Sequence, residues 1–319
     1  MAPRYPFYDV FMENQSELSE KLENICNVFN ITQVLDLKIN NKYIQKYYLV
    51  NRIPYSLFHS STDLIHMAIS RDGLYKEDDL FEPARIVGNY INKSAGRSVL
   101  ELATGRGANS VYLSRKFSAT KFYGIDISKG QLEYAFKKAK IVHNYYPDFG
   151  DYHDLSRFKN ETFDIVFVVE ALCYSTDKNK VLAEAYRVLK KDGVFIIFDG
   201  YSNKNLNQLL HEERIALQLA GKGMAMEKFE SYRSFIRKAK KEKFKIDFEE
   251  NVSQFVLPNM ERFEKKAASF FKRPKTAKIL SRILPKEFTY NIISGYLSTT
   301  LMRQNICNYM ITVLKKEKR

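Results

Sequence analysis

The chain has 319 residues, of which 45% are hydrophobic and 28% charged, a globular composition that excludes a disordered or collagen-like protein. Three widely spaced cysteines, Cys26, Cys173 and Cys307, form no CxxC pair, which disfavours a disulfide framework or zinc site and favours a reducing, cytoplasmic compartment. The net charge of +14 is compatible with a solvated surface, an anionic substrate or peripheral contact with a membrane.

The first 95 residues are predicted to be mostly helical, with a polar break at 39–42. The opening segment, Met1–Tyr8, has no apolar run long enough for a signal peptide. No segment of the chain approaches the roughly 20 apolar residues that a membrane-spanning helix needs. Residues 1–95 are therefore expected to form a helical N-terminal extension, a candidate substrate lid.

Strand and helix patterns alternate from residue 96 to 201. Strands are expected at 99–102, 121–126, 163–169 and 194–198, with helices at 108–117, 129–142 and 178–190 between them. The third of these helices precedes Lys191-Asp-Gly193, which is typical of a C-terminal glycine stop. Such alternation predicts an α/β fold, with a mostly parallel, Rossmann-like sheet and helices on both of its faces.

The alternation ends after residue 201. Residues 202–303 are expected to form a helical insertion, a candidate substrate cap, with Pro274 and Pro285 as breaks and one strand near 243–249. Residues 305–314 have the composition of a closing strand. The predicted core therefore comprises residues 96–201 and 304–319.

A glycine loop, Glu101-Leu-Ala-Thr-Gly-Arg-Gly107, follows the first core strand and opens a helix. Glycines let the backbone approach a ligand, and the helix start offers free amides. The Gly-Lys-Ser/Thr of a Walker loop is absent, and a dinucleotide fingerprint would need a glycine or alanine where Ser110 stands. The carboxylate of Glu101 suits a cationic ligand group, such as an α-amino group.

Further candidate ligand residues follow the next strands. Asp126 ends the second core strand, where a carboxylate commonly accepts hydrogen bonds from a ribose diol, and Ile127 would lie beside an adenine. Asp151 and the backbone amide of Tyr152 could read the adenine amino group and ring nitrogen. Turn capping is the alternative role for Asp151, and His153 is expected to be an exposed loop residue.

With these elements in order, residues 98–200 resemble the core of class I S-adenosylmethionine-dependent methyltransferases. The resemblance implies a seven-stranded sheet whose last strand is antiparallel, S-adenosylmethionine as cofactor, and no metal. Ala103 replaces the first glycine of the family's loop, which is tolerated if its φ stays negative. The cofactor contacts expected from the motifs and the resemblance are Tyr48, Glu101, Ala103, Thr104, Gly105, Gly107, Asn109, Asp126, Ile127, Asp151, Tyr152 and Val169.

Within this class the chain is similar to sterol and cyclopropane-fatty-acid methyltransferases. Glu170 and Tyr174 follow the strand 163–169 as in the sterol type, and a tyrosine-rich segment with His66 resembles the part that closes over the cofactor. The expected catalytic residues are Glu170, Tyr174 and His66, and packing is the alternative role for Tyr174, His66 and His59. The expected partner is a small, partly apolar acceptor.

Three other functions remain open: an RNA or protein methyltransferase, an inactive cofactor-binding scaffold, and a nicotinamide-dependent oxidoreductase. The net charge favours the first. However, no Asn-Pro-Pro-Tyr-type motif follows the strand 163–169, so nucleic acid is disfavoured as a partner.

Overall fold

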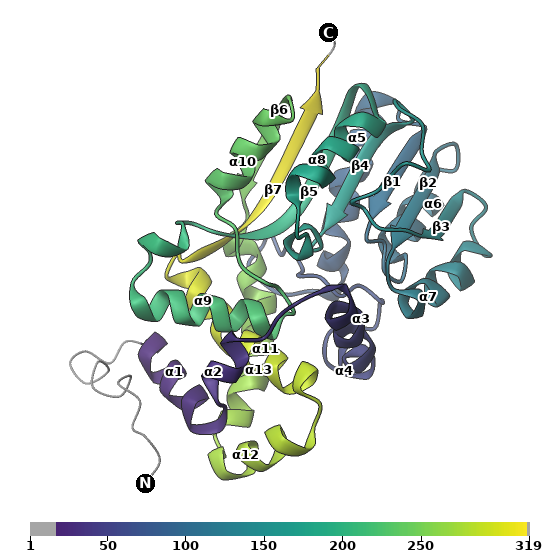
Figure 1. Ribbon diagram of the computed structural model, residues 1–319. Helices are drawn as coiled ribbons and strands as arrows, with labels where there is room; N and C mark the ends of the chain where they lie inside the picture. Colours follow the sequence, from purple (N-terminus) through teal and green to yellow (C-terminus); the bar gives the residue numbers. More distant parts are fainter. Residues whose placement is uncertain (1–16, 318–319) are drawn as a thin grey trace.

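The computed structural model describes residues 17–317, so the prediction for Met1–Tyr8 lies outside the described residues. The described chain contains a seven-stranded sheet in the order β3-β2-β1-β4-β5-β7-β6 (Figure 1). β1 to β5 pair in parallel, and β7 pairs antiparallel with both of its neighbours. The predicted fold class, including the antiparallel last strand, is confirmed. The strands are β1 (Ser98–Leu102), β2 (Lys121–Asp126), β3 (Tyr145–Phe149), β4 (Phe163–Val169), β5 (Leu189–Ser202), β6 (Phe244–Asn251) and β7 (Cys307–Lys316).

Helices cover both faces of this sheet. One face packs on α5 (Glu82–Ser94), α6 (Ala108–Lys116) and α7 (Lys129–Ala139). The other face packs on α8 (Lys178–Val188) and α10 (Tyr232–Lys241). Because β4 carries apolar side chains on both faces, it contributes Phe167 to the first core and Val168 to the second.

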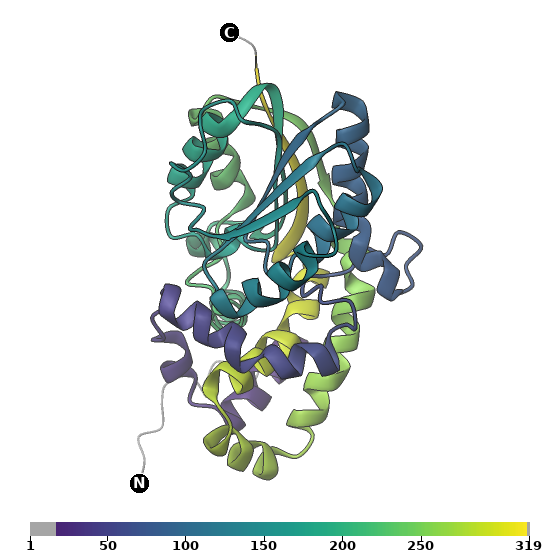
Figure 2. The same cartoon turned by 90° about the vertical axis from the view of Figure 1, so that its right-hand side faces the viewer.

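The remaining long helices form a second layer beyond one end of the sheet, as both ribbon views show (Figures 1 and 2). This layer contains α1 (Glu17–Val28), α9 (His211–Gly223), α11 (Ser253–Phe271), α12 (Pro274–Ile283) and α13 (Lys286–Arg303). Pro274 is the first residue of α12, and Pro285 directly precedes α13. None of the helices between residues 17 and 317 is long and apolar enough to cross a bilayer.

Short N-terminal helices connect this layer to the sheet. They are α2 (Ile31–Leu35), α3 (Asn41–Val50) and α4 (Arg52–Phe58), followed by the 3-10 helix η2 (Glu77–Phe81). The polar break at 39–42 spans the start of α3, where the Asn40 side chain caps the helix by accepting a hydrogen bond from the Tyr43 amide at 2.9 Å. Two further 3-10 turns are η3 (Leu172–Tyr174) and η4 (Leu206–Gln208).

The edge strand β3 was not predicted from the sequence. Its five residues include Pro147, and the side chains of Tyr146 and Phe149 are exposed. Proline is tolerated here because an edge strand leaves part of its backbone unpaired. The sequence of β3 therefore lacks the run of apolar residues that identified the buried strands.

The predicted glycine stop at Lys191-Asp-Gly193 is wrong. α8 ends at Val188, and β5 starts at once with Leu189. The left-handed residue in this turn is Asp192, with φ of 62°. Gly193 is needed for space instead, because a Cβ there would lie 2.9 Å from the Lys190 carbonyl oxygen and 3.0 Å from that of Asp164.

Candidate functional site

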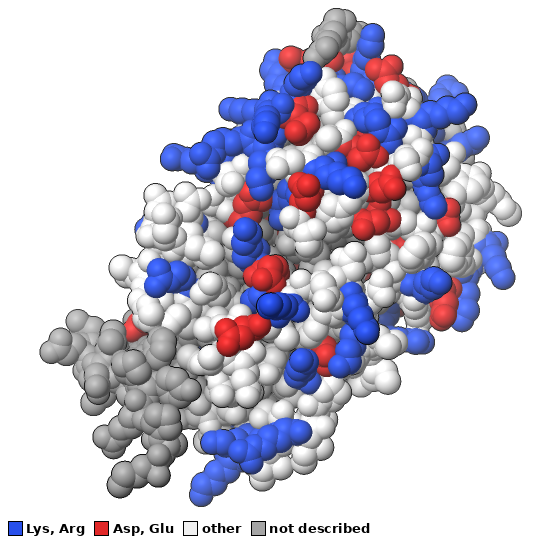
Figure 3. Space-filling view, viewed as in Figure 1, with Lys and Arg blue, Asp and Glu red and all other residues white. Residues whose placement is uncertain are grey.

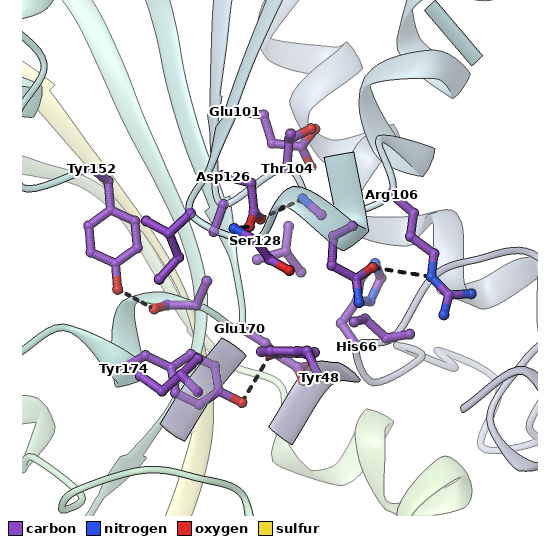
Figure 4. Close-up of a pocket in the computed structure, with 18 of the residues that line it drawn as sticks. Tyr48, His66, Glu101, Thr104, Arg106, Asp126, Ser128, Tyr152, Glu170 and Tyr174 are labelled. Carbon is purple, nitrogen blue, oxygen red and sulfur yellow. Dashed lines mark hydrogen bonds between the residues drawn. The ribbon is translucent and has the colours of Figure 1, made fainter. Parts of the chain in front are cut away.

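A pocket opens at the carboxyl edge of the parallel strands, beside β1 and β4, where the strand order reverses. Ligands of open α/β sheets commonly bind at such a switch point. The glycine loop and the ends of β2 and β4 form one side of the pocket, and α3 with residues 63–66 lies across from them. In Figure 4, Glu101 and Asp126 lie toward the sheet, and Tyr48 and Tyr174 lie on the opposite side.

Glu101 is the buried carboxylate at the end of β1. It accepts hydrogen bonds from the hydroxyls of Thr104 (2.6 Å) and Ser110 (2.5 Å) and from the Asn109 amide (3.3 Å). The Thr104 oxygen also lies 2.8 Å from the Tyr145 hydroxyl, which must donate to it because Thr104 uses its own proton toward Glu101. Burial nevertheless raises the pKa of Glu101 to about 7, although these bonds act in the opposite direction.

Asp126 is the second buried carboxylate and ends β2. Its two oxygens accept the backbone amides of Gly105 (2.9 Å) and Ser128 (2.7 Å). Burial raises its pKa to about 6, against these hydrogen bonds. The hydrogen bond to Gly105 fixes the glycine loop against the end of the neighbouring strand.

The loop after β3 brings Asp151, Tyr152 and His153 to the pocket. The Tyr152 hydroxyl donates to the carbonyl of Ala171 at 3.0 Å. The expectation that His153 is an exposed loop residue is wrong, since its side chain is only 16% exposed. Its two ring nitrogens lie 2.6 Å from Asp151 Oδ1 and 2.8 Å from Ser175 Oγ, which hold the ring between two loops.

Helix α3 faces the glycine loop across the pocket. Its Tyr48 hydroxyl donates to the hydroxyl of Tyr174 at 3.1 Å, and the two rings meet edge to face with centroids 6.0 Å apart. Gln45 of α3 donates to the carbonyl of Ile127 at 3.2 Å. The N-terminal segment therefore contacts the same pocket as the core strands, although more than a hundred residues separate Tyr48 from Tyr174.

Glu170 follows β4 and lines the pocket. Its Oε1 accepts hydrogen bonds from the Met67 amide (2.6 Å) and from the Tyr309 hydroxyl (2.8 Å), and no described residue bonds to Oε2. Its backbone is left-handed, with φ of 48°, a strained conformation that is concentrated at functional positions. Burial raises the pKa of Glu170 to about 7, which places its titration near neutral pH.

His66 is buried beside the pocket. Its Nδ1 lies 3.1 Å from the carbonyl oxygen of Met67, to which it donates, and its Nε2 has no partner among the described residues. Burial lowers its pKa to about 4, so the ring is neutral at pH 7. The other candidate, His59, packs on Phe263 with ring centroids 5.0 Å apart and does not line the pocket.

Arg106 is a lining residue that no sequence pattern singled out. Its buried guanidinium donates to Asp63 at 2.8 Å, to Gln131 and Ser56 at 3.2 Å each, and to the carbonyl of Arg52 at 3.3 Å. It therefore ties the glycine loop to α4 and to the segment after it. The loop motif marked only the glycines around Arg106, because its partners lie far away in the sequence.

Two loop residues differ from expectation. Ala103 has a φ of 55°, so the negative φ that would make alanine easy to tolerate here does not occur. The chain turns sharply there, which lets the Thr104 amide donate to the Ile125 carbonyl at 2.9 Å. Gly107 is not among the residues that line the pocket; a Cβ at this position would lie 2.7 Å from the Tyr145 hydroxyl oxygen.

The other predicted site residues come together around this one pocket. They are Tyr48, His66, Glu101, Ala103, Thr104, Gly105, Asn109, Asp126, Ile127, Asp151, Tyr152, Val169, Glu170 and Tyr174. No cluster of potential metal ligands occurs among residues 17–317.

Comparison with known proteins agrees with this arrangement. Residues 100–197 match the model of a methyltransferase domain family. Sterol methyltransferase-like 3 of Botryococcus braunii is 32% identical over 124 residues, which cover 38% of this chain and 31% of that protein. The match thus spans about a third of the relative's length.

Solved structures share the fold over most of the chain. A geranyl diphosphate methyltransferase in complex with GPP and sinefungin has a TM-score of 0.65 at 16% identity, covering 86% of this chain and 98% of its own. The cyclopropane synthase MmaA2 from Mycobacterium tuberculosis has a TM-score of 0.65 at 15% identity, covering 88% and 100%. The domain match and the sterol methyltransferase-like relative support the predicted resemblance to methyltransferases, and the solved structures show the same fold.

Proposed function

We propose that this chain, whose residues 100–197 match a methyltransferase domain, uses S-adenosylmethionine to methylate a small, partly apolar molecule, such as a lipid, an isoprenoid or a natural product. One observation carries the proposal. Two buried carboxylates, Glu101 and Asp126, share a pocket that Tyr48 and Tyr174 flank from the other side. A pocket with polar and aromatic sides suits a polar cofactor next to a partly apolar acceptor.

The residues present fit S-adenosylmethionine. Among residues 17–317, neither Glu101 nor Asp126 forms an ion pair, although both carboxylates are buried. Asn109 Oδ1 and His66 Nε2 are also buried without hydrogen-bond partners in the described chain. Buried polar atoms without partners are costly unless a ligand supplies them. The cofactor carries an ammonium group and a ribose diol that can donate to these acceptors.

We assign the cofactor contacts accordingly. Glu101 receives the α-amino group, and Asp126 the ribose diol. Asp151, Tyr152 and Ile127 surround the adenine. Further contacts come from Tyr48, Ala103, Thr104, Gly105, Asn109 and Val169 along the same pocket.

The bound cofactor supplies an electrophilic methyl group on a sulfonium. The protein has to orient the acceptor, exclude water, and accept a proton or stabilise positive charge at the acceptor. Glu170 is better suited than His66 for this role. Its pKa of about 7 leaves a large ionised fraction at neutral pH, whereas His66, with a pKa of about 4, is a weak base. Tyr174 flanks the acceptor, and the N-terminal segment covers it through α3 and residues 63–66, whereas no residue of the predicted cap 202–303 lines the pocket.

Calorimetry with S-adenosylmethionine and with its demethylated product tests this proposal. We expect saturable binding of both, with one molecule per chain. Absence of binding for both ligands would contradict the enzyme and favour a scaffold that lacks cofactor. Salt-dependent retention on RNA would instead support a nucleic-acid methyltransferase.

Cofactor affinity is expected to fall by ~20-fold between pH 7.5 and pH 5.5. The ordinary pKa of a glutamate is 4.5, and burial raises that of Glu101 to about 7, so the empty fold takes up a proton over this range. The cationic ligand needs the ionised form and therefore competes with this proton. Calorimetry at three pH values measures how the affinity for the cofactor changes with pH.

The raised pKa of Glu101 also predicts how the stability of the empty fold changes with pH. A raised carboxyl pKa contributes stability that is present below pH 4.5 and is lost as pH rises through about 7. A bound ammonium group removes this cost, so the melting temperature gained on binding should increase with pH. An affinity that does not change with pH would rule out Glu101 as the ammonium site.

A further inference from the structure

Exposed aliphatic side chains gather on two helical segments. On α12, Ile279 and Ile283 are 58% and 73% exposed. On α3 and α4, Leu49, Ile53 and Leu57 are between 66% and 70% exposed. We call these five side chains the aliphatic surface. Single exposed aliphatic residues are common, but a group of this kind needs an explanation.

The two segments adjoin each other at the junction of α12 and α13. Lys46 of α3 forms a 2.7 Å ion pair with Glu287, the second residue of α13, and Asn51 donates to the Glu287 carbonyl at 3.0 Å. Lys286 lies 5.8 Å from the centre of the Tyr43 ring. The end of α12 therefore lies beside α3, and α12, α3 and α4 all lie on the side of the sheet away from the C-terminal end of β7 (Figure 1).

The surroundings of α12 are strongly basic. Between residues 265 and 286 no acidic residue occurs, and the basic ones are Lys265, Lys266, Lys272, Arg273, Lys275, Lys278, Arg282 and Lys286. Figure 3 shows basic side chains without acidic ones at the lower end of the molecule, where Figure 1 places α12. Three exposed acids, Glu17, Glu20 and Glu23, belong to the neighbouring α1.

Helix α12 contributes few buried side chains to its packing against the rest of the protein. Ala277 is its buried residue, whereas its lysines, its arginine and its two isoleucines are exposed. In the helix, Ile279 and Ile283 lie one turn apart on one face, with Lys275, Lys278 and Arg282 along one flank of that face. An apolar face flanked by cations is typical of a helix that lies in the interface of a bilayer.

We propose that the aliphatic surface docks this chain on an anionic lipid bilayer. The basic residues attract anionic headgroups, and the five aliphatic side chains insert among the lipids. A second copy of the chain is less suited than a bilayer to cover the aliphatic surface, since a symmetric interface would bring the two basic segments together and they would repel each other.

This docking gives the pocket access to an apolar acceptor, a consequence that rests on the proposed function. Helix α3 lines the pocket through Ile44 and Tyr48 and exposes the next residue, Leu49. A bilayer in contact with Leu49 and Ile53 therefore lies next to the pocket wall. A membrane-dissolved acceptor could reach the pocket from there without crossing water.

Flotation with vesicles tests the docking in the absence of cofactor. The probes are vesicles of phosphatidylcholine alone and vesicles with ~30% phosphatidylglycerol, each at low and high salt. We expect binding to the anionic vesicles that weakens with salt. The double variant I279S/I283S should bind at least ~10-fold more weakly. A charge variant, K275Q/K278Q, should weaken binding to the anionic vesicles alone.

The control is I141S, which changes an equally exposed isoleucine in the turn before β3, at the amino edge of the sheet and away from the pocket. It should bind vesicles like the unchanged chain, and melting curves should show that all variants fold. Equal binding of the unchanged chain to both kinds of vesicle, or of I279S/I283S and the unchanged chain to anionic vesicles, would overturn the docking. The docking would also be overturned if the unchanged chain were a dimer in solution and the I279S/I283S variant were a monomer.

The two proposals fail separately. Calorimetry with S-adenosylmethionine on I279S/I283S should give the affinity of the unchanged chain, since neither isoleucine lines the pocket. If the chain floats with anionic vesicles but binds no cofactor, the proposed function is wrong and the docking stands. If it binds cofactor but no vesicles, the docking is wrong and the proposed function stands.

Discussion

Replacement of Glu101 by glutamine is expected to weaken S-adenosylmethionine binding by ~100-fold, the effect of removing one partner from a buried, charge-assisted hydrogen bond of about 3 kcal/mol. The glutamine oxygen can still accept from Thr104 and Ser110, so the glycine loop should keep its shape. The ammonium group of the cofactor, however, would lose its counter-charge. Calorimetry at pH 7.5 measures the change directly.

The stability of the same variant separates a binding defect from a folding defect. Because burial raises the pKa of Glu101 to about 7, the empty fold is destabilised by its ionisation at pH 7.5. The neutral glutamine removes that cost, so the free energy of unfolding of E101Q should be unchanged or higher.

The matched control is E133Q, which changes an exposed glutamate of α7 outside the pocket and should leave affinity unchanged. E101Q should also lose most of the pH dependence of binding. Unchanged affinity in E101Q would remove Glu101 from the cofactor site.

Replacement of Glu170 by glutamine is expected to lower methyl transfer by ~100-fold while cofactor affinity changes little. The glutamine oxygen can accept from Met67 and Tyr309 as Glu170 Oε1 does, so the pocket should keep its geometry. What disappears is the charge that would accept a proton or stabilise a cationic acceptor. Transfer of labelled methyl groups from S-adenosylmethionine to a total lipid extract of the source cells provides the measurement.

A second variant tests whether Glu170 acts through its ionisation. Y309F removes one hydrogen bond to Glu170, a bond that lowers the carboxyl pKa against the effect of burial. The pH at which transfer reaches half its maximum should therefore move upward, with little change in cofactor affinity. Full turnover in E170Q, or an unshifted pH profile in Y309F, would contradict a role for the Glu170 carboxylate at the reacting centre.

The strands of the sheet could be predicted where burial on both faces imposes a clear run of apolar residues on the sequence. β4 is buried on both faces, so its sequence is an unbroken apolar run, and its predicted bounds match the structure. The edge strand β3 has no such run, because Tyr145 is its one buried residue and it contains Pro147. The turn at Asp192 could not be deduced either, since the role of Gly193 depends on its distance from the carbonyl of Asp164, a residue of another strand.

Apart from the edge strand β3, the sequence by itself determined the order of the core strands and helices. It also determined the carboxylates at the strand ends, since both follow from local periodicity and motif spacing. Tertiary structure decided what lies across from them. The Tyr48–Tyr174 hydrogen bond, the Tyr309 hydroxyl on Glu170 and the Arg106–Asp63 ion pair each join segments distant in sequence. The pKa values of Glu101 and Glu170 depend on the burial that those segments create. No local pattern encodes such contacts, because they arise when segments distant in sequence fold together at the carboxyl edge of the sheet.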